Sequence, residues 1–111
     1  MSDLKSNIQA QKAELHALCR EYGVERLELF GSATSEAFDA ASSDLDFIVR
    51  FADTSSGYAD RYLDFAEALE ELFGRDVDLV TERSISNPYF RKSVDVTREV
   101  VYDRRREETA A

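Results

Sequence analysis

The sequence has few of the residues that crosslink, interrupt or anchor a chain. It contains one cysteine, one proline, one histidine, four glycines and no tryptophan among 111 residues. Because Cys19 is alone, a disulfide framework and a cysteine-based zinc site are excluded. No apolar run approaches the roughly 20 residues of a membrane-spanning helix. The polar N-terminal segment also lacks the apolar centre of a signal peptide. We therefore expect a protein of the reducing cytoplasm that makes no membrane contact.

Basic residues are also scarce. Lysine and arginine number 14 against 23 aspartates and glutamates, which gives a formal net charge of −9. The segment from Glu36 to Glu82 is still more acidic, with three arginines as its only basic residues. Proteins that bind long nucleic acids present a basic face, because phosphate neutralisation drives that binding. The charge therefore argues against a long nucleic acid as ligand, while compact anions that carry their own divalent cation remain compatible.

The overall composition is that of a globular domain. Hydrophobic residues make up 43% of the chain and charged residues 33%, and the length suits one domain. We expect a single domain over residues 1–111. Its core would span about 24–102, preceded by a helical N-terminal extension and followed by a charged, frayed tail from Arg104.

The hydrophobic pattern predicts strands and helices that alternate along the chain. Helical spacing of apolar residues predicts helices over 2–22, 58–73 and 88–97, with a short one around 35–38. Alternating or dense apolar stretches predict strands over 24–30, 44–51, 76–81 and 99–102. Gly23 and Gly74 are placed to end helices, and Asn87-Pro88 to begin one. The order predicts an α/β (α+β) fold, a small mixed sheet with helices packed mainly on one face.

Three aspartates in two of these strands form the main candidate site. Asp44 and Asp46 begin the second strand, and Asp78 lies in the third. Because side chains alternate along a strand, Asp44 and Asp46 project from one face. Adjacent carboxylates repel each other, and a hard divalent cation between them makes their proximity favourable. If the strand of Asp78 is a neighbour, three carboxylates can hold two Mg²⁺ ions, as in phosphoryl and nucleotidyl transfer.

A glycine-serine turn leaves the first strand at Gly31 and Ser32. Gly31 has no Cβ, so its backbone can approach a phosphate closely. The Ser32 hydroxyl and the N–H groups that follow can then donate to phosphate oxygens. The structural alternative is that the aspartates are merely solvated strand starts. The strongly apolar other face of the strand DLDFIV favours a functional pair, because Asp44 and Asp46 then begin a core strand.

These residues carry a resemblance to a known family. LFGSATSEAFDAASSDLDFIV, residues 29–49, resembles the signature of the DNA polymerase beta-like nucleotidyltransferase superfamily. DVDLVT, residues 76–81, resembles the strand that supplies the third aspartate of that superfamily. The short length and the ending NPYFRKSVDVTREVVYD are similar to the minimal nucleotidyltransferases (MNT) of bacteria and archaea. The resemblance spans about residues 24–102.

The resemblance implies a nucleotidyltransferase fold and a Mg²⁺-dependent reaction. A nucleoside monophosphate, AMP from ATP in the expected case, would pass from an NTP to a hydroxyl. Asp44, Asp46 and Asp78 would be the catalytic, metal-binding residues, with Asp78 also activating the acceptor. Gly31 and Ser32 would hold the phosphates. Many such proteins are antitoxins that AMPylate a tyrosine of a HEPN-type toxin, so the implied partner is such a toxin; a homodimer is also compatible.

The sequence departs from the family pattern in two ways. The spacer from Ala33 to Ser43 has 11 residues, one more than the usual form. The Arg-Gly that commonly follows Gly-Ser is also absent, which removes a cation expected near the triphosphate. Candidates to replace that cation are Arg50, Arg83, Arg91 and Lys92. The departure supports an alternative function, a non-catalytic antitoxin that neutralises its partner by direct binding.

Overall fold

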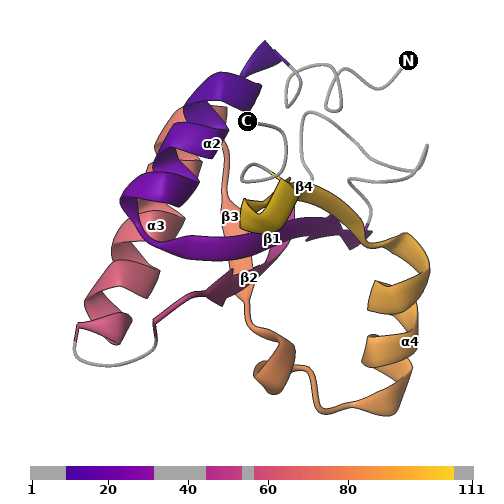
Figure 1. Cartoon of the computed structure of the whole chain (residues 1–111). Coiled ribbons are helices and arrows are strands. Elements are labelled where there is room, and N and C mark those ends of the chain that lie inside the picture. The colour runs from indigo at the N-terminus through magenta and orange to yellow at the C-terminus, as the bar shows by residue number, and fades with distance from the viewer. Residues whose placement is uncertain (1–9, 32–44, 54–56, 107–111) are drawn as a thin grey trace.

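The computed structural model of the chain describes residues 10–31, 45–53 and 57–106 (Figure 1). Its helices are α2 (Lys12–Glu21), α3 (Tyr58–Phe73), α4 (Pro88–Thr97) and the short 3₁₀ helix η2 (Glu82–Ser84). Its strands are β1 (Val24–Phe30), β2 (Leu45–Phe51), β3 (Val77–Val80) and β4 (Glu99–Asp103). The predicted strands and the last two predicted helices match these elements to within a residue at either end. The helix predicted around 35–38 lies outside the described residues, and η2 was not predicted.

The four strands form one mixed sheet in the order β3-β2-β1-β4. β1 is antiparallel to both β2 and β4, whereas β2 and β3 are parallel. A parallel pair needs a crossover connection, and α3 supplies it between β2 and β3. This arrangement confirms the predicted α+β fold with a small mixed sheet.

The larger core lies between one face of the sheet and the helices α2 and α3, which lie side by side (Figure 1). Its fully buried side chains come from both helices and from the alternating positions of the strands, among them Leu15, Phe65, Leu69, Leu27, Leu29 and Phe47. Cys19 is part of this core, and burial raises the pKa of its thiol to about 12. The cysteine is therefore a packing residue that stays protonated, not a nucleophile.

A smaller core lies on the opposite face, under α4. It consists of Phe30, Ile48, Ile85 and Val94, with Val80 packed against it. α4 therefore covers part of the face that α2 and α3 leave open, as Figure 1 shows. Because side chains alternate along strands, the polar residues between the main-core positions of β1, β2 and β3 share this second face. Glu28, Asp46, Arg50 and Asp78 are among those residues. No helix among the described residues is long and apolar enough to cross a membrane.

The N-terminus of α4 is capped as the sequence predicts. The Asn87 side-chain oxygen accepts hydrogen bonds from the N–H groups of Tyr89 (2.8 Å) and Phe90 (3.2 Å), and Pro88 occupies the first helical turn. We expect Asn87→Ala to lower the free energy of unfolding by about 1 kcal/mol, because two N–H groups lose their acceptor. Urea denaturation measures the loss. Asn87→Asp, which keeps the acceptor, is the control; an equal loss in both variants would contradict the role of the cap.

Candidate active site

Asp46 and Asp78 lie side by side on neighbouring strands. They are paired in the parallel ladder of β2 and β3, and neighbouring strands lie about 4.8 Å apart. Paired residues of adjacent strands project from the same face, which here is the face under α4. Asp46 is half-buried and Asp78 is exposed. The structure thus brings these two predicted site residues together, while Asp44 lies outside the described residues.

Gly31 packs directly against Asp46. It follows β1 with a φ of +79°, and its neighbour Phe30 is paired with Asp46 in the ladder of β1 and β2. A Cβ built on Gly31 would lie 2.8 Å from Asp46 Oδ2, closer than real Cβ contacts come. The missing side chain therefore lets the backbone of the turn reach the carboxylate. Ser32, the other predicted phosphate-binding residue, lies outside the described residues.

The same glycine is held from its other side by the end of α4. The Gly31 N–H donates to Thr97 Oγ1 at 2.9 Å. The Thr97 hydroxyl in turn lies 3.0 Å from the Ser93 carbonyl oxygen and 3.3 Å from that of Val94. Thr97 was not singled out from the sequence. The residues around Thr97 in the sequence give no indication of its contact with Gly31, which is 66 positions away.

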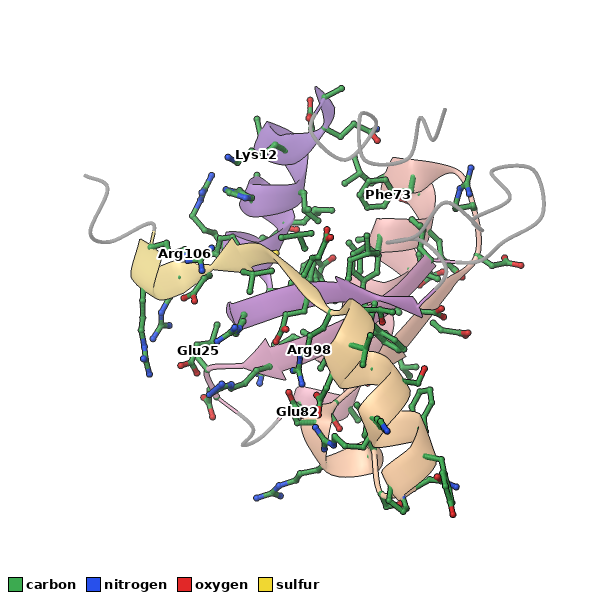
Figure 2. All side chains as sticks on the ribbon, turned by 90° about the vertical axis from the view of Figure 1, so that its right-hand side faces the viewer. Lys12, Glu25, Phe73, Glu82, Arg98 and Arg106 are labelled. Carbon is green, nitrogen blue, oxygen red and sulfur yellow. The ribbon has the colours of Figure 1, made fainter. Side chains whose placement is uncertain are left out.

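An ion-pair network around the buried Glu28 joins α4 to the sheet next to this contact. Glu28 is 5% exposed, and the Arg98 guanidinium donates to both of its carboxylate oxygens, at 2.7 and 2.9 Å. Arg98 also bonds Asp95 at 2.7 Å and pairs with Glu82, beside which it lies in Figure 2. Hydrogen bonding to Glu28 raises the pKa of Arg98 above its usual value. These bonds fix the C-terminus of α4 to β1.

Glu82 makes the network depend on pH. Partial burial disfavours its charged form, but hydrogen bonds from Arg98 and Arg91 outweigh that effect and lower the pKa of its carboxyl group. A lowered folded-state pKa stabilises the protein above the ordinary carboxyl pKa. We expect the stability difference between wild type and Glu82→Gln to persist at pH 6–7 and to shrink as the pH falls below about 4.3. Urea denaturation at several pH values measures it; a difference that grows on acidification would contradict the assignment.

The family's usual arginine after Gly-Ser is absent, and two of the four residues proposed to replace it are poorly placed to bring a positive charge to the aspartate pair. Arg91 pairs with the Glu82 carboxylate and also donates to the carbonyl oxygens of Glu82 (3.0 Å) and Ile85 (3.2 Å). Arg50 shares the face of Asp46 but lies four positions along β2, about 13 Å away at the usual rise per residue. Lys92, on α4, is exposed.

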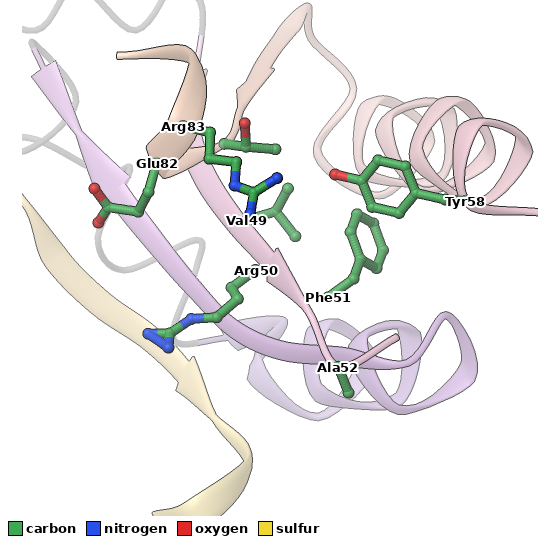
Figure 3. Close-up of a pocket in the computed structure, with 8 residues that line it drawn as sticks. Val49, Arg50, Phe51, Ala52, Tyr58, Glu82 and Arg83 are labelled. Atoms are coloured by element: carbon green, nitrogen blue, oxygen red, sulfur yellow. The ribbon is translucent and has the colours of Figure 1, made fainter. Parts of the chain in front are cut away.

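Arg50 and Arg83 line a different feature, a pocket of about 960 Å³ at the far end of β2 from Asp46. Tyr58, Thr81 and Glu82 also line it. Figure 3 shows Arg83 reaching over Val49, while the Arg50 side chain extends away from Tyr58. The two guanidinium groups therefore do not converge on one point of this pocket.

The chemistry of the aspartate pair fits a hard divalent cation. Carboxylate oxygens are the ligands that Mg²⁺ prefers, and it is usually held by one or two carboxylates together with substrate phosphates. Asp46 and Asp78 offer such oxygens from one face, with the Gly31 backbone beside them. Within the described ranges no cluster of three potential ligands is complete. The predicted third ligand, Asp44, falls outside those ranges.

Gly31 is expected to tolerate a side chain less well than a comparable glycine. Gly31→Ala places a Cβ against Asp46 and also forces alanine into a left-handed conformation, which alone costs about 1–2 kcal/mol. Gly23 is the matched control, because its φ is +70° and a Cβ there would meet nothing within 4 Å. We expect Gly31→Ala to lower the free energy of unfolding more than Gly23→Ala does. Equal losses, measured by urea denaturation, would show that the contact with Asp46 is unimportant.

Comparisons with known proteins identify relatives of this chain in sequence and in fold. A "Putative protein adenylyltransferase" of Methanocaldococcus jannaschii is 34% identical over 95 residues, which cover 86% of this chain and 91% of the relative. A solved structure of a "putative minimal nucleotidyltransferase" is 30% identical with a TM-score of 0.68, covering 87% of this chain and 94% of the other. A complex of the tri-AMPylated Shewanella oneidensis HEPN toxin with its MNT antitoxin is 22% identical with a TM-score of 0.59, covering 93% and 78%.

The last of these likenesses concerns the fold alone, whereas the first two extend to the sequence. In addition, residues 14–101 match the nucleotidyltransferase domain family. That match includes β1, β2, β3, the start of β4, the aspartate pair and Gly31. The chain therefore belongs to the nucleotidyltransferase domain family.

Proposed function

We propose that this protein is a Mg²⁺-dependent adenylyltransferase that transfers AMP from ATP to a hydroxyl group of a partner protein. The observation that carries the proposal is the pairing of Asp46 with Asp78 on one face, with the Gly31 backbone against Asp46. A carboxylate pair beside a backbone that can approach phosphates is what nucleotidyl transfer needs. Membership of the nucleotidyltransferase family supports the same reaction.

In this proposal the metal ligands are Asp44, Asp46 and Asp78, which would hold two Mg²⁺ ions. The bound ions would supply charge neutralisation on the phosphates. Gly31 and Ser32 would bind and orient the triphosphate. The acceptor oxygen then bonds to the α-phosphorus, the bond to the β-phosphate oxygen breaks, and pyrophosphate leaves.

Asp78 is the residue proposed to take the proton of the acceptor hydroxyl. Its carboxylate is exposed, whereas that of Asp46 is half-buried. A macromolecular acceptor can reach an exposed carboxylate, and a general base must come within hydrogen-bond reach of the proton it removes. The two aspartates therefore have different roles in this proposal. Asp46 lies nearer the turn that would bind the phosphates, and Asp78 lies nearer the acceptor.

The partner proposed is a HEPN-type toxin that this protein neutralises as an antitoxin in the cytoplasm. The proposal is supported by the fold neighbour in which an MNT antitoxin accompanies an AMPylated HEPN toxin. The relative named as a protein adenylyltransferase supports a protein acceptor. The net charge of −9 argues for a protein rather than a long nucleic acid as the macromolecular ligand.

The experiment combines the purified protein, Mg²⁺, α-labelled ATP and, as the candidate partner, the product of the neighbouring gene. We expect label on the partner and none when the label is on the γ-phosphate, because pyrophosphate leaves. Mass spectrometry of the partner then gives the modified residue. Absence of α-label on any partner hydroxyl would contradict the proposed reaction.

A non-catalytic antitoxin is the second candidate, favoured by the displaced positions of Arg50 and Arg91. An Asp46→Ala/Asp78→Ala double variant separates the two functions in cells that express the toxin. If the protein acts only by binding its partner, the double variant still protects those cells. Catalysis predicts that protection is lost.

A further inference from the structure

The contact between the end of α4 and the phosphate turn has a role beyond packing. We propose that Thr97 is a positioning residue, whose hydroxyl fixes Gly31 against Asp46 and so sets the geometry of the turn that would bind phosphates. The inference deepens the proposed function and rests on it for its catalytic consequence. Its structural part, the restraint on Gly31, is testable without any activity.

The restraint acts on Gly31 from two sides. Its N–H donates to Thr97 Oγ1 at 2.9 Å, and a Cβ built on it would lie 2.8 Å from Asp46 Oδ2, so a side chain there would displace the carboxylate. A threonine hydroxyl has one hydrogen and two lone pairs. Because that oxygen lies 3.0 Å from the Ser93 carbonyl, its hydrogen is directed into the helix. The lone pairs are left to accept from Gly31.

The position of the Thr97 hydroxyl is itself fixed by its neighbours in α4. Arg98, the next residue, binds both carboxylate oxygens of the buried Glu28 in β1. Val94, one turn earlier, is fully buried in the small core with Phe30. Thr97 thus lies between two attachments of α4 to the sheet, and its oxygen has a defined place relative to the end of β1.

The consequence for catalysis follows from the precision that group transfer requires. A misplacement of about 1 Å can cost on the order of 10²-fold in rate. In Thr97→Val the side chain keeps its shape, but Gly31 loses its acceptor. We expect kcat/KM for ATP to fall by about 10-fold or more. We expect Mn²⁺ affinity to change little, because the substitution keeps both carboxylates and removes only the acceptor of the Gly31 N–H.

Two further variants separate positioning from stability. Thr97→Ser keeps the hydroxyl and is expected to restore most of the lost kcat/KM. Leu69→Ala removes a fully buried side chain of the main core, on the other face of the sheet from α4. It is therefore expected to lower the thermal midpoint without a matching loss of kcat/KM. If Leu69→Ala and Thr97→Val lose activity in proportion to stability, the role is structural only and the proposal is wrong.

The measurement independent of activity is the hydrogen exchange of the Gly31 amide, followed by NMR in the full chain. We expect Thr97→Val to speed this exchange by at least about 10-fold, and Thr97→Ser to leave it close to wild type. Unchanged exchange in Thr97→Val would overturn the inference even in an active enzyme. Wild type without transferase activity would contradict the proposed function, while the exchange data would still decide the restraint on Gly31.

Discussion

Replacing Arg98 with methionine is expected to lower the free energy of unfolding by about 1–3 kcal/mol, as measured by urea denaturation at pH 7. The variant leaves Glu28 buried at 5% exposure without the guanidinium that binds both of its oxygens. Arg26, whose Nε lies 3.2 Å from Glu28 Oε1, remains as a partly exposed partner, so the buried carboxylate is left underpaired in the variant. Small domains have a total stability of about 5–15 kcal/mol, so the loss is a substantial part of the whole.

The double variant Glu28→Met/Arg98→Met tests that reasoning. Replacement of both charges by apolar side chains also removes the buried carboxylate that Arg98→Met leaves underpaired. The double variant should therefore be more stable than Arg98→Met alone. Lys92→Met, an exposed position on the same helix, is the matched control and should change little. A loss below about 1 kcal/mol in Arg98→Met would contradict the importance of the buried pair.

Replacement of either paired aspartate by asparagine is expected to lower AMP transfer by about 10²–10³-fold. Asparagine keeps the size of the side chain but removes the negative charge that would hold the cation. Metal ions at such sites supply several kcal/mol of charge stabilisation, and each 1.4 kcal/mol is tenfold in rate. Initial rates of label transfer in Asp46→Asn and Asp78→Asn give the effect. Neither variant should lose the fold, since the pair adds repulsion to the metal-free protein.

Asp64→Asn is the matched control for the aspartate variants. Asp64 is an exposed residue of α3, the helix that packs on the other face of the sheet. Its replacement removes one negative charge without touching the pair, so transfer should stay close to wild type. A similar loss in all three variants would show that overall charge, and not the site, governs the reaction.

Local chemistry explains why most elements could be predicted from the sequence. The apolar stripe of 58–73 ends at Gly74, which adopts the left-handed conformation that ends a helix, and the structure has α3 over those residues. Asn87 and Pro88 specify the start of α4 through hydrogen bonds two and three residues away. Each of these interactions joins residues that are close in the sequence, so the sequence pattern alone predicts it.

Contacts between distant positions could not be predicted in the same way. The sequence shows that Asp46 and Asp78 each lie in a strand, but it does not contain the strand order that pairs them. Glu28 and Arg98 are separated by 70 positions, and their bond depends on how α4 crosses the sheet. The contact between Thr97 and Gly31 could not be predicted for the same reason. Whether Ser32 and Asp44 complete the site stays a prediction, since both lie outside the described residues.

Paramagnetic broadening by Mn²⁺, which takes the same oxygen ligands as Mg²⁺, tests most directly whether Asp46 and Asp78 jointly hold a divalent cation. In ¹⁵N spectra of the full chain, we expect substoichiometric Mn²⁺ to broaden the amides of Gly31, Asp46 and Asp78 first. Asp46→Asn and Asp78→Asn should each abolish that selective broadening, while Asp64→Asn should not. Broadening that spreads evenly over the acidic surface of wild type, or that survives in both site variants, would contradict the account.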